Sequence, residues 1–331
     1  MRIAKNFKSL VTVLFLFAVT IMASGQTLEE AQKAYNAGIT ANSEGNTEEA
    51  IKQFTACIEA CEYLVEEEED EEAETLQYTV EDVLPNLYLN LGTEQLQNEN
   101  IEAGLANLYK AKETAGWYGK DDVAKKAGDR IAKAHYAEGV NKYKASDLDG
   151  AVADLDKAIA ADADYSSAYY VKAVILKKKD DDAAFKATAL EGIAACKRSN
   201  DTKMLSKIED LAFKHFLKKG NDAKVASKHD EAVSLLNSAL EFGENDVTTL
   251  LLLAQTYSAQ ENLDAAIETG NKAVENETNG AEAQAKIFII IAEAYAKKGD
   301  NSAACAAYKK AAVGQYAEHA NYQIEHVLKC E

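Results

Sequence analysis

The sequence predicts an all-α fold, a solenoid of about seven antiparallel helix pairs that is closed by a C-terminal capping helix. Three observations predict it. Small and aromatic positions return at intervals of about 34 residues between 213 and 314, apolar residues recur at spacings of three and four within each copy, and short polar turns separate the segments. A helix pair of this size buries its apolar face only against a neighbouring pair, so the copies are expected to stack.

The repeat is clearest in the C-terminal third of the chain. Steps of 34 and then 38 residues join three sets of equivalent positions: Gly220, Ala232, Leu236 and Ala239; Ala254, Ala266, Gly270 and Ala273; and Ala292, Ala304, Tyr308 and Ala311. Helices that cross with axes ~8 to 10 Å apart leave little room for large side chains, so these small residues predict the crossings. Gly299 suits a left-handed helix end, and the candidate caps of second helices are Asp230, Asn262, Asp300 and Ser302.

These positions resemble the tetratricopeptide repeat family, whose unit of 34 residues is a helix-turn-helix with aromatics in its first helix and a proline near its end. Tyr257 and Tyr295 keep the aromatic register. The proline is missing from every copy, and the chain's single proline, Pro85, is expected at the start of a helix. The resemblance implies a right-handed superhelix whose first helices line a concave groove that binds a peptide or protein, without enzymatic activity.

The chain begins with the pattern of a secretory signal peptide. Arg2, Lys5 and Lys8 precede an apolar run from Leu10 to Ile21, and small residues at 23–25 offer a cleavage site. We therefore expect residues 1–25 to be removed and the protein to be exported, periplasmic or secreted. The alternative, a membrane anchor, is disfavoured because a spanning helix takes roughly 20 apolar residues. After cleavage no membrane span is expected.

Composition excludes several classes of partner. The chain has 36 Lys and Arg against 55 Asp and Glu, and removing residues 1–25 leaves 33 against 55, a formal charge of −22. Such a field opposes nucleic acids and anionic membranes. The five cysteines, expected mainly as small core residues, are Cys57, Cys61, Cys196, Cys305 and Cys330. We find no catalytic, phosphate-binding or metal-binding motif and expect no cofactor.

The repeat spacing assigns boundaries along the whole chain. Repeats are expected at 26–64, 85–118, 132–165, 166–212 (degenerate, with extra helical residues), 213–246, 247–280 and 281–316, with a capping helix at 317–331. Residues 65–84 form an acidic insertion and 119–131 a helical extension. Within the insertion, Glu66–Glu72 are seven consecutive acids, which are expected to be solvated as either an extended helix end or a loose loop. A calcium site is disfavoured there because ordered ligand spacing and a turn glycine are missing.

Two short segments leave alternatives open. Trp117 and Tyr118 lie between Gly116 and Gly119, where they could stack on a sugar or, as we favour, fill the gap between two repeats. Near the C-terminus, His326 and Cys330 are one helical turn apart and could share a metal, although ordinary surface residues are the favoured interpretation.

The predicted function is that of a non-enzymatic interaction scaffold of the cell envelope. On the first helices of the middle repeats, an otherwise acidic chain places basic and aromatic side chains that could bind an acidic or extended protein segment. The candidate binding residues are Lys133, Tyr136, Tyr143, Lys144, Tyr170, Lys177, Lys178, Lys214, Asn221 and Lys224. Alternatives are a glycan-binding envelope component, suggested by Trp117 and Tyr118, and a self-assembling structural repeat protein that forms homo-oligomers.

Overall fold

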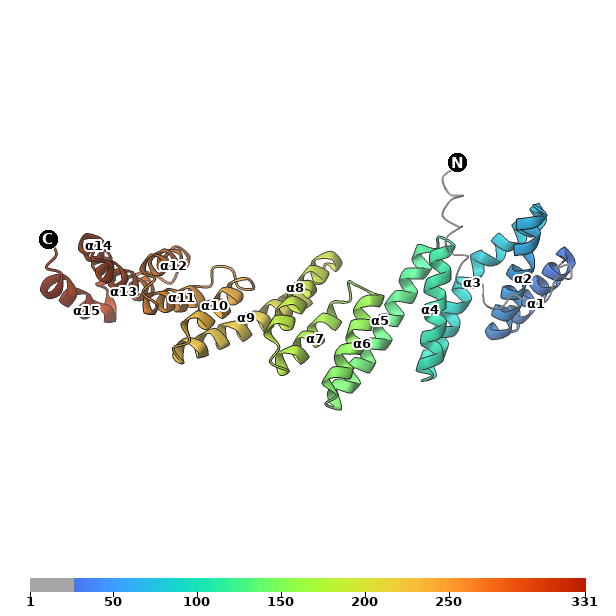
Figure 1. Cartoon of the computed structure of the whole chain (residues 1–331), viewed down its shortest axis with the longest axis horizontal. Helices are drawn as coiled ribbons and strands as arrows, with labels where there is room; N and C mark the ends of the chain where they lie inside the picture. Colours follow the sequence, from blue (N-terminus) through green and yellow to red (C-terminus); the bar gives the residue numbers. More distant parts are fainter. Residues whose placement is uncertain (1–26) are drawn as a thin grey trace. The chain divides into compact units, whose positions relative to one another are not determined.

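The computed structural model describes residues 27–331, so the predicted signal peptide lies outside the described part. Fifteen α-helices, one 3-10 helix and one π-helix form this part, and it contains no strand (Figure 1). The prediction of an all-α protein built from helix pairs is therefore confirmed. Two compact units are present, one extending to Ala134 and the other comprising His135–Glu331. No helix within 27–331 combines the length and the apolar character that crossing a membrane requires.

The first unit contains four helices and the start of a fifth. They are α1 (Leu28–Ser43), α2 (Thr47–Glu67), α3 (Glu71–Gln97), α4 (Ile101–Trp117) and α5 (Asp121–Lys144), of which α5 continues into the second unit. Along the chain α1 packs against α2, α2 against α3 and α3 against α4 (Figure 1). Phe54 and Leu108 are fully buried and form part of the core of this unit.

The second unit continues the same alternation. Its helices are α6 (Leu148–Ala161), α7 (Ser166–Lys178), α8 (Asp182–Ser199), α9 (Thr202–Val225), α10 (His229–Leu240), α11 (Val247–Ala259), α12 (Leu263–Asn276), α13 (Ala281–Lys298), α14 (Asn301–Ala311) and α15 (Ala317–Tyr322). The 3-10 helix Gly314–Tyr316 precedes α15, and the π-helix Gln323–Val327 follows it. The extra helical residues predicted before residue 213 lengthen α9, which begins at Thr202. The repeat boundaries themselves stay predictions.

Glycines lie at the helix crossings, as the repeat predicts. A Cβ added to Gly220 would lie 2.8 Å from Leu236, sixteen positions further on, and one added to Gly92 would lie 2.9 Å from Leu108. The same spacing recurs for Gly38 with Phe54 at 2.8 Å and for Gly139 with Leu155 at 3.0 Å. Real Cβ contacts are rarely this short, so a side chain at these positions would push the paired helices apart.

Most second helices are capped by a side chain, and α4 and α10 are the exceptions. Gly299 adopts φ +85° at the end of α13, and the Asp300 side chain then accepts a hydrogen bond from Ala303 N at 3.0 Å. Asn262 caps α12 in the same way. The prediction for Asp230 is wrong: Lys228 occupies the N-cap of α10, and Asp230 accepts instead from Gln260 Nε2 at 2.6 Å.

The acidic insertion is mostly helical. The run Glu66–Glu72 comprises the end of α2, the turn between α2 and α3, and the start of α3. The side chain of Asp70 caps α3 by accepting hydrogen bonds from the backbone N–H groups of Glu72 and Ala73. Its side chains are largely exposed, as expected. The placement of Pro85 at a helix start is wrong, because α3 begins at Glu71 and Pro85 lies inside it. Since proline lacks an N–H, one hydrogen bond of the helical ladder is missing there.

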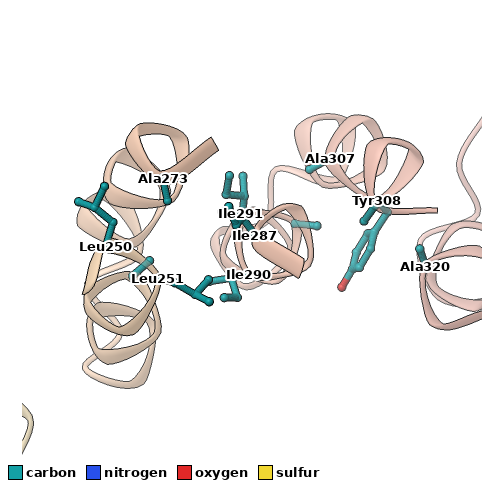
Figure 2. Close-up of a cluster of buried hydrophobic side chains, with 12 residues drawn as sticks. Leu250, Leu251, Ala273, Ile287, Ile290, Ile291, Ala307, Tyr308 and Ala320 are labelled. Carbon is teal, nitrogen blue, oxygen red and sulfur yellow. The ribbon is translucent and has the colours of Figure 1, made fainter. Parts of the chain in front are cut away.

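The C-terminal segment covers the last helix pair as a helix, in which α15 continues directly into the π-helix Gln323–Val327. Figure 2 shows Leu250 and Leu251 of α11 on one side of the isoleucines of α13, with Ala307 and Tyr308 of α14 on the other and Ala320 beyond Tyr308. Ile324 and Leu328 pack against the same cluster. A disulfide between this segment and α14 also holds it there.

The cysteine prediction is correct for three residues and wrong for two. Cys57, Cys61 and Cys196 are buried and free. Cys305 of α14 and Cys330 form a disulfide, with Cα atoms 5.8 Å apart. This pair could not be predicted from the sequence, because the two residues are 25 positions apart and meet only once the C-terminal segment folds back on α14.

Candidate protein-binding site

The predicted binding residues lie on three first helices, α5, α7 and α9. Lys133 belongs to the first unit, whereas the other nine lie in the second unit and are considered together. We define the first-helix face as these nine residues together with Lys207 of α9. Its members are Tyr136, Tyr143, Lys144, Tyr170, Lys177, Lys178, Lys207, Lys214, Asn221 and Lys224. The lysines of this face are exposed, except for half-buried Lys224, and its tyrosines are half-buried. Each aromatic ring therefore keeps part of its surface available to a partner.

A cation–π contact joins α5 to α7. Lys178 Nζ lies 5.4 Å from the ring centroid of Tyr143. Nearby, Tyr136 meets Tyr165 edge to face, with centroids 5.3 Å apart. The predicted neighbourhood of Tyr143 and Lys178 is thus formed by direct contact between side chains of adjacent first helices.

A second contact of the same kind joins α7 to α9. Lys207 Nζ lies 5.9 Å from the ring centroid of Tyr170. Lys207 was not among the predicted residues because it falls among the extra residues before the fifth repeat, where no equivalent position exists in the other copies. Its signal was available in the helical spacing, since Lys207 and Lys214 are seven residues apart on one helix.

The charge of the face is partly balanced from within the chain. Lys214 pairs with Asp210 on its own helix at 2.7 Å, an exposed contact that contributes little stability. Lys144 and Lys177 are exposed in the last turns of α5 and α7, where a positive charge is favourable to the helix end.

Buried polar groups fix the second helices against these first helices. Asp154 on α6 is buried, with Lys142 Nζ 2.5 Å and Lys157 Nζ 3.3 Å from its carboxylate oxygens. Desolvation raises the pKa of Asp154, but the two lysines outweigh it, so the pKa is lowered. The pKa of buried His135 is lowered as well, first by desolvation and then by Lys157. These groups are occupied in holding the helix pair together.

The pair α8 and α9 is joined by a similar arrangement. His215 Nε2 lies 2.7 Å from Asp182 Oδ1, and Lys219 Nζ reaches both Asp182 at 2.5 Å and Asp180 at 2.8 Å. Desolvation opposes ionisation of Asp182, but hydrogen bonds from Lys219 and His215 lower its pKa. Within the described residues, no group of three or more His, Cys, Asp or Glu side chains is arranged to hold a metal.

Residues 247–279 and 285–312 match the family model described as tetratricopeptide repeat. These two segments of the chain are therefore similar to tetratricopeptide repeats. The two matched segments coincide with α11 and α12 and with most of α13 and α14, the two helix pairs that the repeat spacing defined most clearly. Tetratricopeptide repeats are typically binding scaffolds without enzymatic activity, which agrees in class with the prediction. No curated protein matches this sequence.

Several solved structures resemble this chain in fold. YrrB, a TPR protein with an unusual peptide-binding site, is 19% identical, with 60% of this chain and 89% of YrrB aligned and a TM-score of 0.29. A tetratricopeptide repeat protein from Parabacteroides merdae is 12% identical, with 92% and 100% aligned and a TM-score of 0.31. PilF of Pseudomonas aeruginosa is 16% identical, with 76% and 95% aligned and a TM-score of 0.26. At these values no residue role extends from them to this chain.

The interpretation of Trp117 as a filler between repeats is wrong. Trp117 is the last residue of α4, and 55% of its surface is exposed. Tyr118 is half-buried, and desolvation together with Glu81 and Glu62 raises its pKa to about 12. The proposed metal pair is also altered, because the sulfur of Cys330 is bonded to Cys305.

A shallow pocket of about 300 Å³ lies elsewhere in the tetratricopeptide repeats, at the N-terminal ends of α11 and α13. Leu251 and Ile287 form apolar walls, while Glu277, Glu282 and Lys286 supply charges of both signs. Glu282 accepts a hydrogen bond from Gln315 N at 3.3 Å, which ties this helix end to the C-terminal segment. With opposed charges, the pocket has no evident preference for an ionic ligand.

Proposed function

We propose that this tetratricopeptide repeat protein is a non-enzymatic scaffold of the cell envelope that binds an acidic or extended segment of a partner protein on its first-helix face. The observation that supports the proposal is the pair of cation–π contacts, Lys178 with Tyr143 and Lys207 with Tyr170, because together they connect three successive first helices. A partner strand lying across α5, α7 and α9 would meet alternating rings and ammonium groups.

The physical argument rests on area and charge. Tyrosine rings supply rigid contact area at a small cost in conformational entropy, whereas lysines steer an acidic partner and set its register. The chain as a whole carries a formal charge of −19, so the exposed lysines of the first-helix face place positive charge on a surface that is negative overall. Acidic segments are therefore favoured there and disfavoured over the rest of the surface.

Export is part of the proposal. It is supported by the basic, apolar and small-residue order of residues 1–25 and by the Cys305–Cys330 disulfide, since disulfides persist in oxidising compartments. N-terminal sequencing of protein recovered from the native cell tests it. A first residue near Gln26 is expected, whereas an intact Met1 in all recovered protein would contradict export through this segment.

Binding to a labelled octaglutamate peptide, followed by fluorescence anisotropy, tests the face directly. The double variant Lys178→Gln with Lys207→Gln removes both cations that lie over tyrosine rings. We expect binding to weaken roughly tenfold at low salt, and the difference to shrink as salt screens the charges. The matched control is Lys197→Gln with Lys272→Gln, because both lysines are exposed on second helices of the same unit. Equal binding by the two double variants would place the binding surface elsewhere.

Two alternative functions have their own readouts. The exposed ring of Trp117 is the observation that favours a glycan-binding component, and titration with envelope saccharides monitored by tryptophan fluorescence tests it. A self-assembling repeat protein would show a mass that rises with concentration in light scattering. A response in either measurement, with no octaglutamate binding, would favour that alternative over the scaffold.

A further inference from the structure

The connection between α12 and α13 contains two neighbouring residues that can react with each other. Asn279 is followed directly by Gly280, the only Asn-Gly pair in the chain. Both residues are exposed, and both lie between the helices, since α12 ends at Asn276 and α13 begins at Ala281. The backbone nitrogen that follows an asparagine can attack the side-chain carboxamide, because the two groups are close enough to close a small ring. Glycine leaves this approach open since it carries no Cβ.

The space around the attacking nitrogen is empty in this structure. A Cβ added to Gly280 would meet no atom within 4 Å, so no neighbouring side chain or backbone blocks the approach. Gly280 adopts φ +97°, in a region that glycine enters freely and other residues rarely adopt. The backbone at this position therefore depends on glycine, the residue that hinders ring closure least.

Neither of the two reacting groups is held by a hydrogen bond. Among the interactions of residues 27–331, the carboxamide of Asn279 has no hydrogen-bond partner and the N–H of Gly280 donates to no acceptor. The hydrogen bond that Asn279 does make runs from its backbone N–H to Glu277 Oε1, at 2.7 Å. That bond holds the backbone before the reacting pair and leaves both reacting groups free.

Asn276 lies three residues earlier and is protected by comparison. Its Nδ2 donates to Lys272 O at 2.8 Å, and its side chain is half-buried. The next residue is Glu277, whose side chain crowds the approach of its own backbone nitrogen. Ring closure at Asn276 would require both the loss of a hydrogen bond and the movement of a side chain.

Two asparagines in other turns also differ from Asn279. Asn200 and Asn245 each precede an aspartate, and in each case the N–H of that aspartate is engaged in a backbone hydrogen bond. The donor–acceptor distances are 2.9 Å after Asn200 and 3.2 Å after Asn245. The attacking nitrogen is therefore occupied at both turns, whereas it is free at Gly280.

We propose that Asn279 is a site of spontaneous covalent modification in the folded protein. The backbone nitrogen of Gly280 loses its proton and forms a bond to the side-chain carbonyl carbon of Asn279. The bond between that carbon and the amide nitrogen breaks, and ammonia leaves. Water then opens the resulting succinimide at either of its two carbonyl groups, which gives aspartate or isoaspartate. No electrons are transferred, and water is the only co-reactant.

Both products change the start of α13. Each adds a negative charge directly before the first turn, and this charge lies beside a pocket that Glu277 and Glu282 already line. The pocket would thereby become more acidic. Isoaspartate also lengthens the backbone between α12 and α13 by one methylene group. Since Gln284 Nε2 holds this connection through Glu277 O at 3.1 Å, we expect the first turn of α13 to exchange its amide hydrogens faster in the isoaspartate form.

Peptide mapping by mass spectrometry tests the proposal on the full chain. The folded protein is incubated at mildly alkaline pH, and the tryptic peptide 273–286 is followed from a baseline digested at the start, because it contains both Asn276 and Asn279. Replacement of the NH2 group by OH is expected to be at least roughly tenfold faster at Asn279 than at Asn276, since the hydrogen bond and the following side chain raise the barrier at Asn276. Chromatography should separate an aspartate product from an isoaspartate product.

Two variants with equally conservative changes give the control. Asn279→Gln lengthens the side chain by one methylene group, so the amide loss from this peptide is expected to disappear. Asn276→Gln should leave the rate at Asn279 within about twofold of the natural sequence. Equal rates at Asn276 and Asn279 would overturn the proposal, as would amide loss that occurs at Asn279 in the denatured chain and not in the folded one. Amide loss that persists in Asn279→Gln would also overturn it.

Discussion

Breaking the Cys305–Cys330 disulfide should loosen the C-terminal end of the chain and little else. The bond closes a loop spanning 25 positions, for which the chain-entropy relation gives about 3.5 kcal/mol at 25 °C. Because solenoid repeats contact only their neighbours, this loss is expected in α14, α15 and the adjoining helices and not across the whole protein. Tyr308, Ala320, Ile324 and Leu328 would then hold the segment by packing alone.

Hydrogen exchange followed by mass spectrometry measures this effect. In Cys305→Ser with Cys330→Ser, amides of α14 and α15 are expected to lose protection by up to roughly 300-fold, the equivalent of about 3.5 kcal/mol. Amides of α2 and α3 should be unchanged. Cys196→Ala is the control, since Cys196 is free and buried in α8. Unchanged exchange in the C-terminal segment, or five reactive thiols in the denatured unreduced protein where three are expected, would refute the reasoning.

Three further perturbations test other parts of the structure. Ala266→Phe should destabilise the second unit by roughly 1 to 3 kcal/mol in denaturant unfolding, because Ala266 is fully buried at a helix crossing; an unchanged midpoint would contradict that crossing. Asp70→Ala should cost about 1 kcal/mol by removing the N-cap of α3, measured against Glu69→Ala. Since Lys219 and His215 lower the pKa of Asp182 in the folded protein, its carboxylate stabilises the fold above pH ~4 and that contribution is lost as the pH falls through the folded pKa. Asp182→Asn should therefore melt at a lower temperature than the natural sequence at pH 7. This difference in melting temperature should become smaller at pH 3.

The helix crossings could be predicted from the sequence because they depend on side-chain volume at fixed spacing. Gly220 with Leu236 and Gly38 with Phe54 show the requirement plainly, since a Cβ on either glycine would meet its partner at 2.8 Å. Such a constraint leaves the same trace in every copy. The all-α fold and the helix pairs followed from it without any knowledge of partners.

Features that depend on one contact in one place could not be predicted in this way. The Cys305–Cys330 bond needs the C-terminal segment to fold back, the proline in α3 is tolerated inside a helix, and Lys207 reaches Tyr170 from residues outside the repeat. None of these recurs, so periodicity gave no signal. Exposure is likewise a property of the assembled helices, which is why Trp117 was assigned to a gap that it does not fill.

The residues at the helix crossings are different from the exposed residues, so the same kind of helix pair can expose either mainly acidic or mainly basic side chains. The glycine-to-large-residue crossing is the same in α1 with α2 and in α9 with α10, although residues 27–134 contain 24 Asp and Glu against 9 Lys and Arg, a formal −15, and residues 135–331 contain 31 against 24, a formal −7. Exposed positions of these helices do not enter the crossing, so lysines can be exchanged for glutamates there at little cost to the fold. The acids of the run Glu66–Glu72 and the lysines of the first-helix face use this freedom in opposite directions. Partner choice in this protein therefore depends on exposed residues that the repeat pattern leaves unconstrained, and mutations there should change binding without changing the melting temperature.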